Sequence, residues 1–281
     1  MATWVFLHAH PDDESSQTAG TMAMAHDRGD RVVNIIATDG TMGTAAADLR
    51  EGETVADRRR EELMNSARVL GIDRVEWLGY QDSGMTGWPS NADPRAFCNA
   101  DPDQAAARVA EILREEQADV LVGYDPHGGY GHPDHIMVHT VGTAAAALVG
   151  GGLRVLQGSF NQDARADIQA IARRLDVPEM VLFDPEAVGD DGILIGSPAS
   201  ELRWAIDLPE AILERKRNAL AAHASQTSDA GFFLTLPAEL FQALLGCECY
   251  REPANPGPLT HAWPLDHALP ADRPGRPNSG Q

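Results

Sequence analysis

The stretch "WVFLHAHPDDESS" (residues 4–16) places two histidines and three acidic residues directly after a short apolar run. Its first four residues predict a buried β-strand, and its end predicts a helix that is capped by Ser15 or Ser16. A simple turn between these elements would need one Asp or Asn and some glycine. Pro11 instead restricts the residue before it to extended backbone, which fixes the direction of the His10 ring. The stretch therefore predicts a strand-to-helix connection that carries a polar site.

The first 150 residues alternate short β-rich runs with helical patterns. Strands are expected at 4–7, 31–38, 74–79 and 118–124, and helices at 15–29, 53–71, 102–117 and 135–150. Apolar strands that alternate with amphipathic helices favour a parallel sheet covered on both faces. With right-handed crossovers, this order predicts an α/β fold with a Rossmann-like, doubly wound and mostly parallel sheet.

The rest of the chain has a weaker pattern, and we expect it to add a smaller C-terminal α+β portion. Strands are expected at 153–158, 180–184 and 192–196, and helices near 164–175 and at 214–225 and 236–246. The predicted organisation is a Rossmann-like core at 1–150, a portion at 151–250 that completes the sheet and the pocket, and a Pro/Gly-rich tail at 251–281. We expect this tail to lie on the surface or to be disordered.

Charge and cysteine spacing exclude several classes of protein. The 281 residues include 42 acidic and 22 basic side chains, a formal charge of −20, which disfavours nucleic acid and membrane surfaces as partners. No apolar run reaches the about 18 residues of a membrane span, and the start lacks a basic signal region. The cysteines have no C-x-x-C spacing, so neither a disulfide framework nor a thiolate zinc site is predicted. We expect a cytoplasmic protein, and the sequence leaves open whether it forms a homo-oligomer.

A second polar cluster, "HPDH" (132–135), follows the strand expected at 118–124 through a loop at 125–131 and opens the next helix. In open α/β sheets the carboxyl ends of the strands form the site, so we expect both clusters to lie at one edge. Imidazole and carboxylate ligands suit Zn²⁺, and a catalytic zinc takes three protein ligands plus water. Each cluster alone is also an ordinary helix start, but their conjunction favours a metal site.

The motifs "AHPDDE" and "HPDH" after a "DPH…G" loop are similar to those of the LmbE-like (PIG-L) family of zinc-dependent N-deacetylases. The chain most closely resembles the branch with the mycothiol-pathway deacetylase and the mycothiol-conjugate amidase. The resemblance covers residues 1–140 and resumes at "KRNALAAHASQ" (216–226). It implies a hydrolase that removes an acetyl or another acyl group from the 2-amino group of a glucosamine-type sugar or glycoside.

Three other functions stay open at this point. The chain could be an amidase of a mycothiol-like conjugate, a deacetylase of natural-product biosynthesis, or a non-catalytic sugar-binding relative. A nucleotide-dependent Rossmann enzyme is disfavoured, because no G-x-G-x-x-G follows the first strand.

The resemblance implies that His10, Asp13 and His135 hold the metal. The family uses Zn²⁺, and Fe²⁺ would suit the same two histidines and one carboxylate. It also implies that Asp12 is the general base. A bound metal lowers the pKa of water from about 15.7 to about 7 and polarises the amide carbonyl. A carboxylate beside that water, which is not itself a ligand, can remove its proton and return it to the leaving amine.

Further histidines and their neighbours complete the predicted centre. By the resemblance, His132 faces the substrate's carbonyl oxygen, where it can donate a hydrogen bond to the oxyanion or protonate the amine. Asp134 is expected to orient one of the rings. Tyr130 is either a further oxyanion donor or a loop tyrosine packed on its neighbours. We expect His8 and His139 to be structural.

Two outer segments resemble substrate-binding motifs of the family. "RRREEL" (58–63) matches its Arg-x-x-Glu-Leu, and "YQDSGM" (80–85) is similar to the deacetylase's Asp-Ser-Gly-Met loop. By this resemblance, Arg59 and Asp82 contact sugar hydroxyls and Met85 lines the pocket. Arg59 is equally expected as a solvated charge in a basic run.

One loop departs from the family pattern. In "TDGTMGT" (38–44), Thr41 and Met42 stand where the relatives usually carry an acid that faces the substrate. "DSGM" resembles the deacetylase, whereas "HAHPDDESS" resembles the conjugate amidases. The departure bears on the identity of the substrate and leaves the expected zinc chemistry unchanged.

Overall fold

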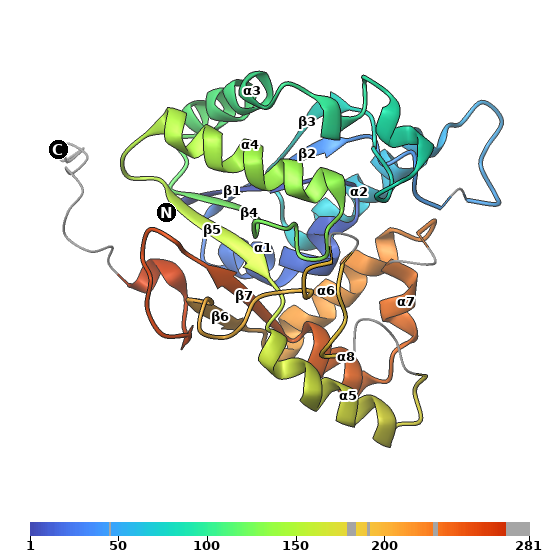
Figure 1. Ribbon diagram of the computed structural model, residues 1–281, viewed down its shortest axis with the longest axis vertical. Helices are drawn as coiled ribbons and strands as arrows, with labels where there is room; N and C mark the ends of the chain where they lie inside the picture. Colours follow the sequence, from blue (N-terminus) through green and yellow to red (C-terminus); the bar gives the residue numbers. More distant parts are fainter. Residues whose placement is uncertain (45, 179–183, 190–191, 227–229, 268–281) are drawn as a thin grey trace.

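The computed structural model describes residues 1–281 except 45, 179–183, 190–191, 227–229 and 268–281. Its described part contains an eight-stranded sheet with the order β3-β2-β1-β4-β5-β7-β6-β8 (Figure 1). β1 to β5 pair in parallel, and β7 is antiparallel to both of its neighbours. The strands are β1 (Thr3–His8), β2 (Arg31–Thr38), β3 (Arg74–Tyr80), β4 (Val120–Tyr124), β5 (Arg154–Ser159), β6 (Trp204–Asp207), β7 (Cys247–Arg251) and β8 (Thr260–His261).

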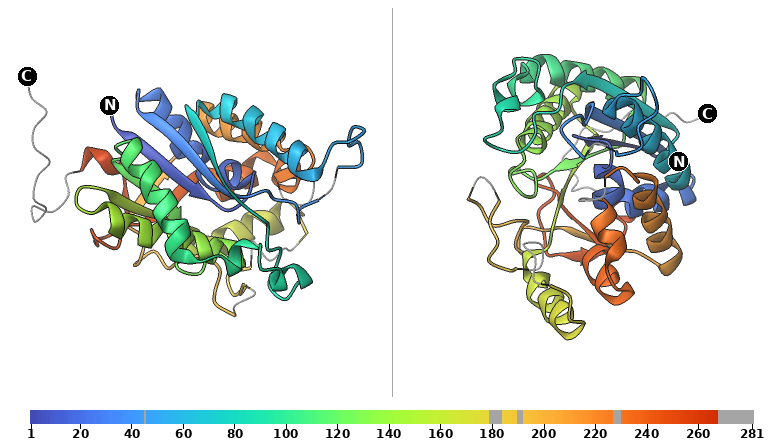
Figure 2. Two further views of the ribbon diagram at one scale, coloured as in Figure 1. Left: turned by 90° about the horizontal axis from the view of Figure 1, so that it is seen from above. Right: turned by 90° about the vertical axis from the view of Figure 1, so that its right-hand side faces the viewer.

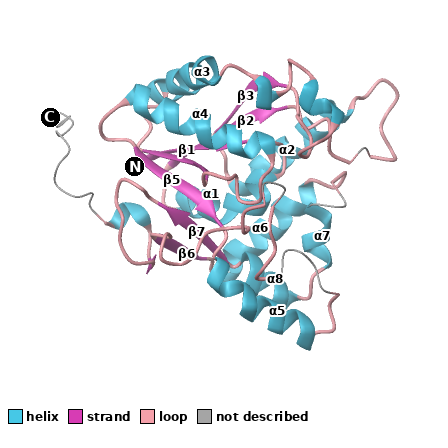
Figure 3. Cartoon of the chain, viewed as in Figure 1, coloured by secondary structure: helices cyan, strands magenta, loops and turns pink. Residues whose placement is uncertain are grey.

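Helices cover both faces of this sheet (Figures 2 and 3). The helices are α1 (Ala19–Asp27), α2 (Val55–Leu70), α3 (Pro102–Glu115), α4 (Pro133–Val149), α5 (Arg165–Arg174), α6 (Glu210–Ala222), α7 (Ala230–Thr235) and α8 (Ala238–Leu245). α3 and α4 pack on one face, and α1, α2, α5, α6 and α8 contribute to the core on the other. The predicted α/β class with a doubly wound, mostly parallel sheet is confirmed. No helix among the described residues is long and apolar enough to cross a membrane.

The central strand β1 shows why the sheet needs both layers. Trp4 and Phe6 belong to the core beneath α1 and α6, and Val5 and Leu7 belong to the core beneath α3 and α4. Successive side chains of a strand point to opposite faces, and all four are fully buried. A continuous apolar run of this kind is typical of a parallel strand that is covered on both sides.

The second half of the chain differs from the prediction at several elements. The expected strand at 192–196 is wrong, because Gly192 and Gly196 have φ values of +74° and +86°, which interrupt an extended conformation. Most of the strand expected at 180–184 lies outside the described residues. The short strands β6 and β8 were not predicted.

The C-terminal segment packs into the fold further than its composition predicts. Glu252 is buried and accepts two hydrogen bonds from the Arg154 guanidinium, at 2.8 and 2.7 Å. Trp263 packs against Trp4 of β1, with ring centroids 4.8 Å apart. Up to His267 this Pro/Gly-rich stretch is anchored by a buried ion pair and an aromatic contact, although many of its side chains lie on the surface.

The parallel strands end on the same side of the molecule. In Figure 1 they run from the side of the N-terminus toward the side of α7. The loops that leave β1, β2, β3 and β4 therefore meet at one edge, as open α/β sheets require for their sites. These four loops carry the motif residues described next.

Candidate active site

The loop after β1 sends its two adjacent aspartates in different directions. Asp12 has a φ of 120°, a region that residues other than glycine rarely adopt and that costs on the order of 1–3 kcal/mol. The His10 N–H donates to Asp13 Oδ2 (2.8 Å), and the Asp12 N–H donates to Glu14 Oε2 (2.9 Å). With the backbone held in this way, Asp12 faces Arg59 and Asp13 faces the histidines.

His135, in the first turn of α4, has one paired and one bare ring nitrogen. Its Nδ1 lies 3.1 Å from the carbonyl oxygen of Gly128. Because a carbonyl only accepts, Nδ1 carries the proton and Nε2 keeps its lone pair. Nε2 is buried without a hydrogen-bond partner among the described residues. Gly128 has a φ of +66°, and a Cβ there would come within 2.4 Å of His135 Cβ, so only glycine allows this approach.

Both ring nitrogens of His10 lie against carboxylates. Its Nε2 is 3.1 Å from Asp134 Oδ2, and its Nδ1 is 3.4 Å from Asp13 Oδ2. Burial lowers the pKa of His10, but Asp82, Asp13 and Asp134 outweigh burial and raise it well above its ordinary value. Asp134 is fully buried and also accepts hydrogen bonds from the backbone N–H (2.9 Å) and the hydroxyl of Ser83. Asp134 is thus placed to fix the His10 ring, as expected of it.

His132 presents an N–H rather than a lone pair. It is the N-cap of α4, and its Nδ1 accepts a hydrogen bond from the Asp134 N–H at 3.1 Å. Burial, followed by the neighbouring His10 and His135, lowers the pKa of His132 to about 2. The ring is therefore neutral, and its proton lies on Nε2. This tautomer suits a hydrogen-bond donor and not a metal ligand.

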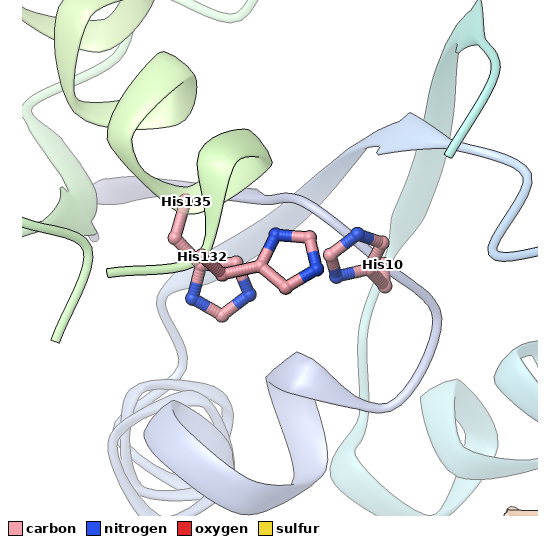
Figure 4. Close-up of side chains that lie close together, drawn as sticks. All are labelled: His10, His132 and His135. Atoms are coloured by element: carbon pink, nitrogen blue, oxygen red, sulfur yellow. The ribbon is translucent and has the colours of Figure 1, made fainter. Parts of the chain in front are cut away.

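The donor atoms fit a divalent metal. Asp13 Oδ2 lies 3.4 Å from His10 Nδ1, and Asp13 Oδ1 lies 3.4 Å from His135 Nε2. Each separation matches the roughly 3.3–3.6 Å between neighbouring ligand atoms of a tetrahedral zinc with bonds of about 2.0–2.2 Å, and the two separations involve different oxygens of Asp13. His10, His132 and His135 also bring ligand atoms within 4.8 Å of one another, and Figure 4 shows their rings side by side. The hydrogen bond that His132 accepts at Nδ1 leaves its proton on Nε2, which favours Asp13 over His132 as the third ligand.

Asp12, the predicted base, is held by Arg59. Arg59 Nη2 lies 3.0 Å from Asp12 Oδ2, and the same guanidinium donates to the carbonyl oxygens of Gly40 and Pro11. Burial raises the pKa of Asp12 to about 6, although Arg59 acts in the opposite direction. The carboxylate is therefore ionised at neutral pH, as a base must be. The predicted contact of Arg59 with sugar hydroxyls stays a prediction.

A buried ion pair lies behind Asp12. Glu14 Oε1 is 2.7 Å from His223 Nε2 and accepts hydrogen bonds from Ser66 (2.6 Å) and Ser15 (2.7 Å). Burial alone would raise the pKa of Glu14, but His223 and the two hydroxyls lower it to about 2. The predicted helix cap at Ser15 or Ser16 is wrong, because Ser15 binds Glu14 and the segment 14–18 forms a π-helix instead.

A cavity of about 550 Å³ opens above these groups. The predicted site residues on its lining are His10, Asp12, Asp13, Arg59, Asp82, Met85, Tyr130 and His132. His135 and Asp134 lie beneath this surface, fully buried. Asp82 Oδ1 is 3.4 Å from His10 Nε2, and Tyr130 packs edge-on against His135 with ring centroids 4.9 Å apart. All the predicted residues are thus brought to one place, and their individual roles stay predictions.

Residues 5–146 match the PIG-L family, described as GlcNAc-PI de-N-acetylase. The chain belongs to the PIG-L family. Two relatives, from Acidothermus cellulolyticus and Rhodococcus jostii, are named 1D-myo-inositol 2-acetamido-2-deoxy-alpha-D-glucopyranoside deacetylase. Each is 36% identical, over 88% and 87% of this chain and over 87% and 89% of the relatives. The resemblance expected from the motifs is confirmed.

Solved structures of deacetylases share the fold of this PIG-L protein. The N,N'-diacetylchitobiose deacetylase from Pyrococcus horikoshii has a TM-score of 0.54 at 24% identity, over 89% of this chain and 82% of its own. The A40926 pseudoaglycone deacetylase Dbv21 has a TM-score of 0.56 at 15% identity, over 89% and 96%. At these identities the comparison supports the common α/β architecture.

The outer motifs of this PIG-L chain prove to bind one another. The backbone N–H and hydroxyl of Ser225 donate to Glu62 at 2.8 and 2.6 Å. The side chain of Gln226 pairs with the backbone of Thr44, at 3.1 and 3.0 Å. The segment at 223–226 is thus bound both to Glu62 of α2 and to the loop at Thr44, which holds these loops together beside the cavity.

Two histidines, which were expected to be structural, form hydrogen bonds inside the fold. His8 is fully buried between the Tyr124 hydroxyl (2.8 Å) and the Thr18 hydroxyl (2.9 Å). His139 Nδ1 donates to the Tyr124 carbonyl at 3.0 Å. Neither belongs to a group of ligand atoms that could hold a metal in the described part of the chain.

Sequence reasoning missed two sets of site residues. Glu14, Ser83 and His223 lie inside or beside motifs that the sequence analysis quoted, so their place in a motif was an available signal. The apolar side chains that line one side of the cavity had no such signal. They are Phe160, Ile195, Phe232, Phe233 and Leu245.

Proposed function

We propose that this protein is a metal-dependent deacetylase that hydrolyses the amide of a 2-acetamido-2-deoxy-glucopyranoside. The observation that carries the proposal is the arrangement of His10, Asp13 and His135 beside His132. His10 and His135 each place a ring nitrogen 3.4 Å from an oxygen of Asp13, whereas His132 accepts the Asp134 N–H at Nδ1 and therefore offers an N–H at Nε2. A site that only binds sugar would need neither this ligand set nor a buried carboxylate base. The names of the two relatives supply the substrate class.

The third ligand and the metal are part of the proposal. When bound by His10, Asp13 and His135, Zn²⁺ would polarise the amide carbonyl and acidify a water molecule, and Fe²⁺ suits the same ligands. The bare Nε2 of His135 and the two 3.4 Å separations around Asp13 support this assignment.

The remaining chemistry belongs to the chain's own side chains. Asp12 accepts a proton from water as the water oxygen forms a bond to the carbonyl carbon. The His132 Nε2–H donates a hydrogen bond to the carbonyl oxygen, where negative charge develops. When the C–N bond breaks, the proton on Asp12 passes to the leaving nitrogen. The products are acetate and the free amino sugar.

The proposal is tested by primary-amine release from methyl N-acetyl-α-D-glucosaminide and its inositol counterpart, with zinc-loaded protein. We expect amine release that stops on addition of a chelator and returns with zinc. Asp12→Asn serves as the inactive control, and Asp103→Asn, an exposed change at the start of α3, serves as the active one. Absence of amine release from every acetamido glycoside, with metal bound, would contradict the proposal.

A further inference from the structure

One side of the cavity is apolar, although its floor is polar. The side chains that we name the apolar wall are Phe160, Ile195, Phe232, Phe233 and Leu245. They come from the end of β5, the loop before β6, α7 and the end of α8. None of these side chains can form a hydrogen bond with a hydroxyl group. The wall therefore suits a part of the substrate that has no hydroxyls.

Two segments of the apolar wall contact the loop that positions His135. The Ser197 N–H donates to the Phe160 carbonyl at 2.8 Å, and the Gly196 N–H donates to the Gly129 carbonyl at 3.0 Å. A Cβ at Gly129 would lie 3.7 Å from the Phe160 ring, so the two segments are in close contact. Gly129 belongs to the same loop that positions His135. The part of the wall around Phe160 and Ile195 is thus joined to the loop of the reacting centre.

The apolar lining reaches further than an amino sugar requires. The cavity of about 550 Å³ is in the range of pockets that hold drug-sized ligands. Four wall residues also line a neighbouring cavity of about 130 Å³. Met42 and Trp88 line the rim of the larger, 550 Å³ cavity, and their side chains are 37% and 43% exposed. Apolar side chains that stay exposed around a cavity mark a place where an apolar group binds.

We propose that the apolar wall binds an apolar aglycone, an alkyl or aromatic group on the anomeric carbon of the amino-sugar substrate. The proposal rests on the deacetylation proposed above. The anomeric carbon is bonded to C2, the carbon that bears the reacting amide, so an aglycone of several atoms extends from beside the reacting centre along the apolar wall. A polyol in this place would lose its hydrogen bonds to water without new partners, whereas an alkyl chain gains free energy by leaving water.

The test compares kcat/KM of the zinc-loaded protein for methyl, hexyl and inositol N-acetyl-α-D-glucosaminides, and for a methyl glycoside with a hexanoyl in place of the acetyl group. We expect the hexyl glycoside to exceed the methyl glycoside at least about 10-fold, since even one methylene in an apolar pocket can give about that ratio. Phe232→Ala should lower the hexyl-to-methyl ratio at least about fivefold, and Trp88→Ala should lower it less. Leu148→Ala, an exposed apolar change on α4 away from the cavity, should leave the ratio unchanged.

A second readout does not depend on turnover. Calorimetric titration of the chelator-treated protein with hexyl α-D-glucosaminide, the deacetylated product, should give a Kd at least about 10-fold below that for the methyl product, with Phe232→Ala removing the difference.

The outcomes separate the two proposals. Hydrolysis of the methyl glycoside without a preference for hexyl, or with the inositol glycoside preferred, would overturn the aglycone proposal alone. A preference for the hexanoyl amide would assign the wall to the acyl group and overturn it as well. Failure to hydrolyse any of the four substrates would instead contradict the proposed deacetylase.

Discussion

The floor and the apolar wall of the cavity are built in different ways. The floor consists of ionisable side chains from loops at the ends of β1, β3 and β4, and hydrogen bonds to carboxylates and backbone groups orient each ring. The wall consists of side chains from separate segments between Phe160 and Leu245, of which Phe232, Phe233 and Leu245 pack against the core. Hydrolysis needs particular atoms in particular protonation states, whereas an apolar wall tolerates changes of similar volume. The residues of the floor therefore form recognisable sequence motifs, whereas the residues of the wall do not.

The largest effect on metal binding and turnover is expected when a proposed metal ligand in the floor is replaced. His135→Ala should reduce bound metal from one equivalent to a small fraction and abolish turnover, because the bare Nε2 disappears from the floor. Metal analysis after zinc reloading and gel filtration measures this. His139→Ala, one turn further along α4, is the matched control. Retention of a full equivalent by the His135 variant would remove His135 from the ligand set.

Asp12→Asn should separate metal binding from chemistry. Loss of a general base costs about 10²–10⁴ in kcat, and the amide keeps the size of the carboxylate beside Arg59. Bound metal should stay at one equivalent. Turnover close to that of the unchanged protein would show that another group accepts the proton.

His132→Gln should give a smaller loss, about 10²–10³ in kcat, with little change in KM, because the N–H acts on charge that develops in the transition state. Steady-state kinetics and metal analysis on the same preparation test this. If bound metal fell as far as in the His135 variant, His132 would be a ligand and the tautomer argument would fail.

The smallest effect on turnover is expected from a change in the ion pair of Glu14 and His223, which lies behind the floor. Burial alone would lower the pKa of His223, but Glu14 raises it above the ordinary value. The ion pair therefore stabilises the folded state fully below the unfolded pKa of about 6.5, and this stabilisation is lost as pH rises through the folded pKa.

His223→Gln keeps a donor toward Glu14 but removes the charge. It should lower the free energy of unfolding by about 1.5–3 kcal/mol near pH 6, and the difference from the unchanged protein should shrink toward pH 9. Urea denaturation across this range measures it. A difference that stays constant or grows with pH would contradict a charged His223.

The strands and helices of the first half could be predicted from sequence because apolar runs and helical spacing coincide there. The strand at 31–38 was predicted with the bounds of β2. The same reasoning failed at 192–196, where two glycines with positive φ interrupt an apolar run. It also missed β6 and β8, which have only four and two residues and depend on pairing with distant segments.

The residues of the floor could be named from motifs, but their arrangement could not. The proton on His135 depends on the carbonyl of Gly128, and the orientation of His10 depends on Asp134 and through it on Ser83. Arg59 was expected either to contact sugar hydroxyls or to be a solvated charge. The second expectation is wrong, because Arg59 is buried and its guanidinium reaches two backbone carbonyls and Asp12. These partners come from other loops, so only the folded chain shows them.

The measurement that tests the central claim most directly is a titration of zinc into chelator-treated protein, with amine release from methyl N-acetyl-α-D-glucosaminide followed at each addition. The account predicts that activity rises linearly to one equivalent of zinc per chain and then levels off. Activity that is already complete before zinc is added to metal-free protein, or that fails to rise although one equivalent binds, would contradict a metal-dependent deacetylase built on His10, Asp13 and His135.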